Sequence, residues 1–234
     1  MINEAIILAG GLGTRLRSVI QEVPKSMALI NQKPFLEYLL DYLIEKGLSR
    51  FIISVGYKST YIADHFGEEY KGCELVYAFE EQPLGTGGAI KNSLPHVTGD
   101  NVLIVNGDSL FVVDIPRQYS FHIDHEADVT LALKPLINFD RYGTVETDRN
   151  NRITGFKEKE QRDHGYINGG IYIFNVAAFN KINFPEKFSI EKDYFQCYAD
   201  SMNFYGFISD SYFLDIGIPE DLARAQDEFK RLTY

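Results

Sequence analysis

The sequence predicts an α/β protein with a Rossmann-like, doubly wound and mostly parallel sheet in a single domain. Apolar runs alternate with helix-period segments through the first half of the chain, which is typical of parallel β-α-β units. The 234 residues suffice for one buried core, and they contain no internal repeat, low-complexity tract or Pro/Gly/Ser-rich linker.

The order of the predicted elements follows from hydrophobic periodicity. Apolar residues recur at helical spacing from Phe35 to Ile44, and Gly47 then ends the helix. Pro219, followed by Glu220 and Asp221, favours the start of a last helix that reaches Arg231. Strands are predicted at 4–9, 51–55, 74–79, 101–106, 128–133, 143–147, 152–156, 166–174 and 203–208, with further short helices at 59–66 and 86–94.

Composition excludes several classes of function. The net charge of −10 argues against nucleic-acid and anionic-membrane partners, because a polyanion would be repelled by most of the surface. Cys73 and Cys197 have no metal-ligand spacing and are expected to be reduced, buried thiols. His122 and His125 are expected to be a solvated pair on a helix. The absence of a long apolar run or an N-terminal signal pattern predicts a cytoplasmic protein.

The glycine-rich loop after the first strand predicts a phosphate-binding site. Gly10-Gly11-Leu12-Gly13-Thr14-Arg15 follows an apolar run, and Pro24-Lys25 comes shortly after it. Glycines there would turn with positive φ and expose N–H groups, while Arg15 and Lys25 neutralise the anion. The plainer alternative is a turn that joins a strand to a helix. The dinucleotide fingerprint would need a glycine at Leu16, and the Walker-type loop is absent.

Two aspartates are candidate ligands for Mg²⁺. Asp108 follows the buried strand 101–106 through Asn106-Gly107, at the strand end where open parallel sheets bind ligands. The alternative is an aspartate in a simple turn. Asp215 precedes the last helix and, taken alone, is more typical of a helix N-terminal charge. Their spacing in the sequence does not place them together.

These segments, in this order, resemble the sugar-1-phosphate nucleotidyltransferase family, whose fold is glycosyltransferase-A-like. The resemblance implies that residues of about 1–115 bind the nucleotide and that about 116–234 bind the sugar and include the C-terminal helix. It implies that Arg15 and Lys25 are catalytic and that Asp108 and Asp215 hold Mg²⁺. The implied nucleotide-binding residues are Leu8, Ala9, Gly10, Gly11, Gly13, Thr14, Arg15, Lys25, Gln82, Gly87 and Asp108.

The resemblance continues into the base- and sugar-binding segments. Gln82 and Gly87 fall in a loop that reads the nucleobase edge in the family, although a Pro/Gly loop capped by Thr86 is the structural alternative. The implied sugar-binding residues are Gly143, Glu158, Lys159 and Asn168, with Lys159 on the sugar phosphate. Alternating charges such as Glu158-Lys159 are otherwise typical of a solvated strand face.

Within the family, some segments are most similar to bacterial D-glycero-α-D-manno-heptose 1-phosphate guanylyltransferases, which make GDP-heptose for surface polysaccharide. These segments are Pro34–Tyr38, Glu81–Ile90, Phe188–Asp193 and Asp215–Asp221. The partners implied are GTP and a sugar 1-phosphate, without nucleic acid or membrane; a homo-oligomer is left open. The alternatives are a mannose-, glucose- or N-acetylmuramate-1-phosphate nucleotidyltransferase using another NTP, and a non-catalytic nucleotide-sugar sensor.

Overall fold

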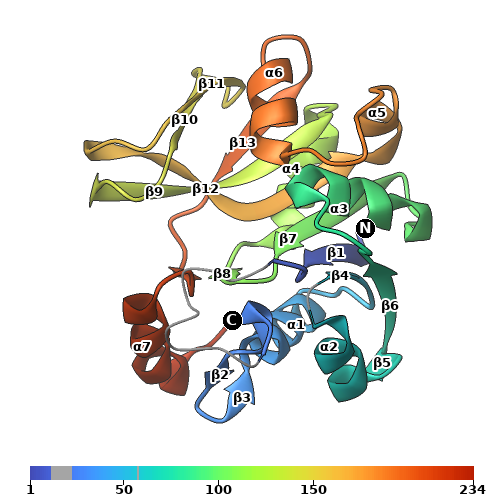
Figure 1. Ribbon diagram of the computed structural model, residues 1–234. Helices are drawn as coiled ribbons and strands as arrows, with labels where there is room; N and C mark the ends of the chain where they lie inside the picture. The colour runs from blue at the N-terminus through green and yellow to red at the C-terminus, as the bar shows by residue number, and fades with distance from the viewer. Residues whose placement is uncertain (12–22, 57) are drawn as a thin grey trace.

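A large twisted sheet runs through both halves of the chain. The computed structural model describes residues 1–11, 23–56 and 58–234 (Figure 1). The centre of the sheet is formed by parallel strands: β7 (Asn101–Asn106), β1 (Glu4–Leu8), β4 (Arg50–Val55) and β6 (Cys73–Phe79), in that spatial order. The small strand β5 (Glu69–Tyr70) lies antiparallel beside β6. The predicted α/β class with a mostly parallel sheet is confirmed.

Beyond β7 the sheet continues with antiparallel strands from the second half of the chain. Strand β12 (Arg162–Asn175) pairs with β7, with β9 (Val129–Phe139) and with β10 (Thr144–Thr147). Strand β11 (Ile153–Lys157) pairs with β10, and β13 (Phe204–Ile208) runs parallel to β9. The second half therefore extends the sheet of the first half, as Figure 1 shows.

Helices cover both faces of the central strands (Figure 1). One face carries α1 (Phe35–Glu45), α2 (Ser59–Phe66) and α7 (Pro219–Glu228); the other carries α3 (Gly85–Ser93), α5 (Val176–Asn180) and a π-helical segment, Ile190–Phe195. Ala5 and Ile7 of β1 pack into the first core, and Ile6 packs into the second. Burial on both faces explains the continuous apolar run by which this strand could be predicted.

The remaining elements are short or lie at the edges. Helix α4 (Ile115–Asp124) packs on β9 and β13, and α6 (Gln196–Tyr198) follows the π-helical segment. The others are β2 (Leu29–Ile30), β3 (Lys33–Pro34), β8 (Ser109–Phe111), β14 (Phe213–Asp215) and 3₁₀ turns at Lys25–Met27, Leu94–His96 and Phe229–Arg231. The sequence pattern did not predict β8 and β14, because three residues are too few to show strand alternation.

Two expectations from the composition were wrong in part. His122 is buried rather than solvated, because α4 turns it toward β7 and β9. Its Nε2–H donates to Asn101 Oδ1 at 3.1 Å, and its Nδ1 accepts the Thr130 hydroxyl at 2.8 Å. Both cysteines are free thiols, as expected, but Cys197 is exposed and only Cys73 is buried. Among the described residues, no helix has both the length and the apolar character needed to cross a bilayer.

The buried His122 predicts a specific pH dependence of stability. Burial lowers the pKa of His122 to about 4, so the unfolded chain binds more protons than the folded chain between about pH 6.5 and pH 4. The contribution of His122 is complete above pH 6.5 and falls by about 2 kcal/mol by pH 5. Urea unfolding of His122→Gln at pH 7.5 and pH 5 should show a smaller pH-dependent loss than wild type by this amount.

The matched control for this test is His125→Gln, a half-buried histidine on the same helix. It should keep the pH dependence of the wild type. A His122→Gln protein that loses as much stability between pH 7.5 and pH 5 as wild type would show that burial of His122 does not cause the effect.

Candidate active site

Asp108 and Asp215, far apart in the sequence, lie side by side in the structure. Strand β14 runs antiparallel to β8 and places Asp215 opposite Ser109, the residue after Asp108. The N–H of Ile216 donates to the carbonyl oxygen of Asp108 at 3.0 Å. The pairing of β8 with β14 therefore places the Asp215 carboxylate, from near the C-terminus, at the end of β7.

Gly107 allows Asp108 to stand beside the first strand. Its N–H donates to Leu8 O at 3.0 Å, and a Cβ at Gly107 would lie 2.7 Å from the same oxygen. Any side chain at this position would therefore push β7 away from β1. The glycine places the Asp108 carboxylate at the carboxyl end of the parallel strands, where α/β sheets bind ligands.

Lys25 supplies the positive charge between the two carboxylates. Its Nζ lies 2.5 Å from Asp108 Oδ2 and 3.5 Å from Asp215 Oδ1. The lysine side chain is 12% exposed, against 38% for Asp108 and 21% for Asp215. Because Lys25 and Asp215 are largely shielded from water, their charges interact more strongly than those of a fully exposed ion pair would.

The electrostatics of Asp215 suit a site for a further cation. Burial raises the pKa of Asp215 above its ordinary value, and the negative charge of Asp108 adds to the rise, whereas Lys25 opposes it. The Oδ1 atom of Asp215 is buried and accepts no hydrogen bond from the described part of the chain. A buried carboxylate oxygen that has a long ion pair with Lys25 Nζ, at 3.5 Å, but accepts no hydrogen bond favours binding of a further cation at this point.

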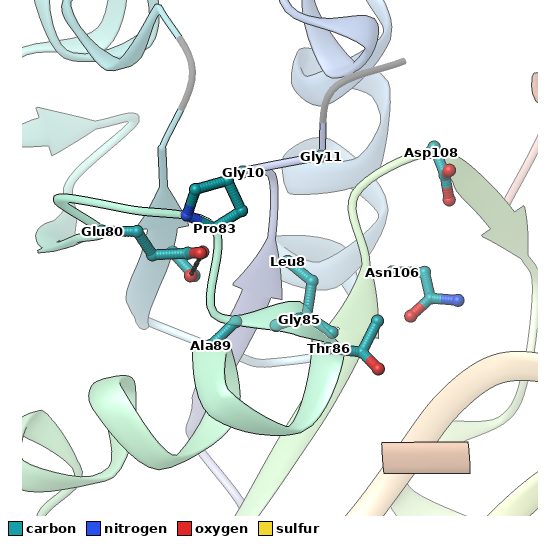
Figure 2. Close-up of a pocket in the computed structure, with 11 residues that line it drawn as sticks. Leu8, Gly10, Gly11, Glu80, Pro83, Gly85, Thr86, Ala89, Asn106 and Asp108 are labelled. Carbon is teal, nitrogen blue, oxygen red and sulfur yellow. Dashed lines mark hydrogen bonds between the residues drawn. The ribbon is translucent and has the colours of Figure 1, made fainter. Parts of the chain in front are cut away.

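A pocket of about 440 Å³ opens beside Asp108 at the carboxyl ends of the central strands (Figure 2). Strands β1, β4 and β7, the residue that follows β6 and helix α3 contribute to its wall. The lining residues are Leu8, Gly10, Gly11, Ser54, Glu80, Pro83, Gly85, Thr86, Ala89, Asn106 and Asp108. Figure 2 shows Asn106 and Asp108 on one side of the pocket and Glu80 on the other.

The predicted phosphate loop borders this pocket where the structure describes it. Leu8, Gly10 and Gly11 line the pocket, and Ala9 is anchored by its N–H, which donates to Ser54 O at 2.9 Å. Neither Gly10 nor Gly11 has a positive φ, so that expectation was wrong for these two glycines. A Cβ at Gly10 would lie 2.7 Å from Glu80 Oε1 and 3.2 Å from Gly56 N, so a side chain there would displace the Glu80 carboxylate. The predicted ligands Gly13, Thr14 and Arg15 lie outside the described residues.

The two residues predicted to recognise the base, Gln82 and Gly87, do not line the pocket. Gln82 is exposed in the turn before α3 and is not part of the pocket wall. Gly87 is buried against Phe188: its N–H donates to Phe188 O at 3.0 Å, and a Cβ would lie 2.2 Å from the Phe188 ring. Thr86 does not cap α3 but donates its hydroxyl to Glu191 Oε2 at 2.8 Å.

Three of the predicted sugar-binding residues come together at the ends of neighbouring strands. Thr144 pairs with Lys157 on β11 and with Ile167 on β12. Continuing this antiparallel register by one position brings Gly143 opposite Glu158 and Asn168. Lys159 follows on the exposed segment after β11.

Asn168 lies near Asn106 but outside the lining of the pocket. Its Nδ2 donates to the hydroxyl of Tyr172 at 3.0 Å, and its Oδ1 accepts the Gly170 N–H at 2.9 Å. Gly170 has φ of 76°, and a Cβ there would lie 2.8 Å from Asn106 Nδ2. The β-bulge between Asn168 and Tyr172 therefore turns this part of β12 toward the end of β7.

Some pocket residues were not singled out from the sequence. Ser54 and Glu80 lie at the ends of β4 and β6, and both line the pocket. The rule that ligands bind at the carboxyl ends of parallel strands would have found Glu80, because it directly follows the predicted strand 74–79. Asn106 belongs to the Asn106-Gly107-Asp108 segment, for which the sequence analysis predicts a role only for Asp108.

Comparisons with known proteins agree with this geometry. The model of the nucleotidyl transferase family matches residues 4–231. The D-glycero-alpha-D-manno-heptose 1-phosphate guanylyltransferase of Aneurinibacillus thermoaerophilus is 52% identical over 97% of this chain and 98% of its own length. The enzyme of the same name from Campylobacter jejuni is 43% identical over 93% and 96%, respectively.

A solved structure extends the similarity to the fold. The crystal structure of HddC from Yersinia pseudotuberculosis complexed with GMP-PN has a TM-score of 0.87 and 34% identity to this chain. The similarity covers 97% of this chain and 100% of HddC. From the match of the family model to nearly the whole sequence, we conclude that the chain belongs to the nucleotidyl transferase family.

Proposed function

We propose that this protein transfers a guanylyl group from GTP to D-glycero-α-D-manno-heptose 1-phosphate, forming GDP-heptose and pyrophosphate. The observation that carries the proposal is the cluster of Lys25, Asp108 and Asp215 at the edge of a nucleotide-sized pocket beside the glycine loop. The names of the similar enzymes support the choice of GTP and heptose. The product would be a sugar donor for surface polysaccharide, such as capsule or lipopolysaccharide, made in the cytoplasm.

The proposed reaction needs no general base. An oxygen of the sugar phosphate, already anionic at neutral pH, attacks the α-phosphorus of GTP. The new phosphorus–oxygen bond forms as the bond to the bridging oxygen breaks, and the electron pair leaves with pyrophosphate. Catalysis is then mainly positioning and stabilisation of charge, which are the main contributions of proteins to phosphoryl transfer.

The residues present fit a magnesium ion. Mg²⁺ prefers oxygen ligands and is commonly held by one or two carboxylates together with substrate phosphates. Asp108 and Asp215 offer such a pair, and the buried Asp215 Oδ1 has free acceptor capacity. Among the described residues, no group of three or more His, Cys, Asp or Glu side chains is placed to hold a metal unaided. When bound, Mg²⁺ would neutralise charge on the α-phosphate.

The remaining roles are assigned to residues around this cluster. Lys25 can neutralise phosphate oxygens as well as carboxylates, so we propose that it binds the triphosphate together with Arg15. On the sugar side, the exposed ammonium of Lys159 would attract the sugar phosphate. Glu158 and Asn168, which the register of β10, β11 and β12 sets on either side of Gly143, would bind sugar hydroxyls.

A matrix of substrates tests the proposed activity. Pyrophosphate release is measured with ATP, CTP, GTP, UTP and dTTP against heptose, mannose, glucose and N-acetylmuramate 1-phosphates. We expect the fastest turnover with GTP and the heptose 1-phosphate. A preference for UTP or dTTP would contradict the guanylyl assignment, and no turnover with any pair would favour a nucleotide-sugar sensor.

Removing one charge from the carboxylate pair should stop the reaction without unfolding the protein. Asp108→Asn keeps the shape of the side chain but loses a ligand charge, and we expect pyrophosphate release to fall by about 10²–10³-fold, as for other single electrostatic groups. The melting temperature checks the fold. Asp124→Asn makes the same chemical change at an exposed position on α4 and should keep wild-type turnover. An undiminished rate in Asp108→Asn would exclude the proposed role.

A further inference from the structure

The first turn of helix α3 is bonded to a segment from far along the chain. The N–H of Phe188 donates to Leu84 O at 3.0 Å, and the N–H of Gly87 donates back to Phe188 O at 3.0 Å. The N–H of Ile190 donates to the oxygen of the Thr86 hydroxyl, also at 3.0 Å. The chain that enters the π-helical segment is therefore fixed beside the wall of the pocket, which Thr86 lines.

Two glycines at the start of α3 make this close approach possible. A Cβ at Gly85 would lie 2.6 Å from Phe188 O, and a Cβ at Gly88 would lie 2.4 Å from Glu186 O. Because these oxygens belong to the backbone, a side chain at either glycine would push the incoming segment away from α3. The glycines of this loop are therefore needed to dock the segment.

The docked segment places the carboxylate of Glu191 beside the pocket. Its Oε2 accepts the Thr86 hydroxyl at 2.8 Å and the Ser189 hydroxyl at 2.7 Å. The side chain is half-buried. Within the described part of the chain, it forms no ion pair, and its Oε1 accepts no hydrogen bond. Glu191 is thus anchored through one oxygen and keeps acceptor capacity on the other.

Glu191 also lies close to a side chain that is predicted to bind the sugar. Burial raises the pKa of Tyr172, and the negative charge of Glu191 adds to the rise, so this carboxylate lies near the Tyr172 hydroxyl. The same hydroxyl accepts a hydrogen bond from Asn168 Nδ2 at 3.0 Å. Figure 2 shows Thr86, to which Glu191 is bonded, on the same side of the pocket as Asn106. Glu191 and Asn168 are therefore neighbours across the Tyr172 hydroxyl.

The chemistry of this position restricts the ligand that it can bind. An ionised carboxylate only accepts hydrogen bonds, so it favours a ligand with donor groups and repels phosphate oxygens. Sugar hydroxyls are such donors, and a hydrogen bond to a charged acceptor is stronger than one between neutral groups. The carboxylate of Glu191 therefore suits a sugar hydroxyl and does not suit a triphosphate.

We propose that Glu191 binds a hydroxyl of the sugar 1-phosphate and contributes to the choice of sugar, an inference that rests on the proposed guanylyl transfer. Thr86 and Ser189 hold the carboxylate in one orientation. The ribose of GTP offers the same kind of hydroxyl. The proximity of Glu191 to Tyr172 and Asn168 connects it to the predicted sugar-binding strand β12, and this favours the sugar 1-phosphate.

Kinetics of pyrophosphate release test this role in Glu191→Gln. The amide oxygen can still accept the hydroxyls of Thr86 and Ser189, but the charge that binds the sugar is lost. We expect KM for heptose 1-phosphate to rise about 10- to 100-fold, the usual effect of losing a hydrogen bond to a charged group. The kcat should stay unchanged. The affinity for GTP with Mg²⁺, measured by isothermal titration calorimetry without sugar phosphate, should equal that of wild type.

The matched control is Glu186→Gln, the same change at an exposed residue of the same segment and outside the pocket wall. It should keep the wild-type KM and GTP affinity. A Glu191→Gln protein with the wild-type KM for heptose 1-phosphate would overturn the proposal. So would a loss of GTP affinity alone, which would place the carboxylate on the ribose. Equal weakening of both substrates would show that Glu191 only holds α3 in place.

A crystal structure of the wild-type chain with GDP-heptose decides the question even if Glu191→Gln does not fold. A heptose hydroxyl should lie about 3 Å from Glu191 Oε1. A ribose hydroxyl in that place, or no contact with the sugar, would overturn the proposal. If these tests fail while wild type turns over heptose 1-phosphate, only the role of Glu191 is wrong. If wild type turns over no sugar 1-phosphate, the proposed function fails and this inference fails with it.

Discussion

The contact of one lysine with two aspartates is the interaction on which the site depends. Lys25 lies before the first helix, Asp108 follows a central strand, and Asp215 precedes the last helix, so the cluster ties together the beginning, middle and end of the chain. Two carboxylates this close would repel each other without a cation. Lys25 meets this need in the structure, and the same carboxylates are the groups proposed to hold Mg²⁺ when GTP is bound.

Close backbone contacts position the groups around this cluster. Gly107 lets β7 and β1 approach at the point where Asp108 emerges, and Gly10 leaves space for Glu80. The pairing of β8 with β14 places Asp215 beside Asp108, and the bulge in β12 brings Asn168 toward Asn106. The pocket is therefore polar at both ends, with Lys25 and the aspartates at one and Glu80 at the other.

Much of the fold could be predicted because buried parallel strands are continuous apolar runs and the helices have clear periodicity. The segments 4–9, 51–55, 74–79 and 101–106 match observed strands closely. By contrast, β8 and β14 are too short to show a pattern, and their pairing depends on residues about a hundred positions apart. For the same reason, the sequence pattern alone could not predict that Asp215 lies beside Asp108. Gln82, which residue type suggested as the base reader, lies outside the pocket wall, whereas Glu80 at the end of β6 lines it.

A crystal structure of the protein with Mn²⁺ and a non-hydrolysable GTP analogue tests the central claim most directly, because anomalous scattering locates the metal. The account predicts Mn²⁺ between the carboxylates of Asp108 and Asp215, with Lys25 Nζ on a phosphate oxygen. It would be contradicted by a metal bound elsewhere, or by Lys25 still joining the two aspartates while the nucleotide occupies the pocket.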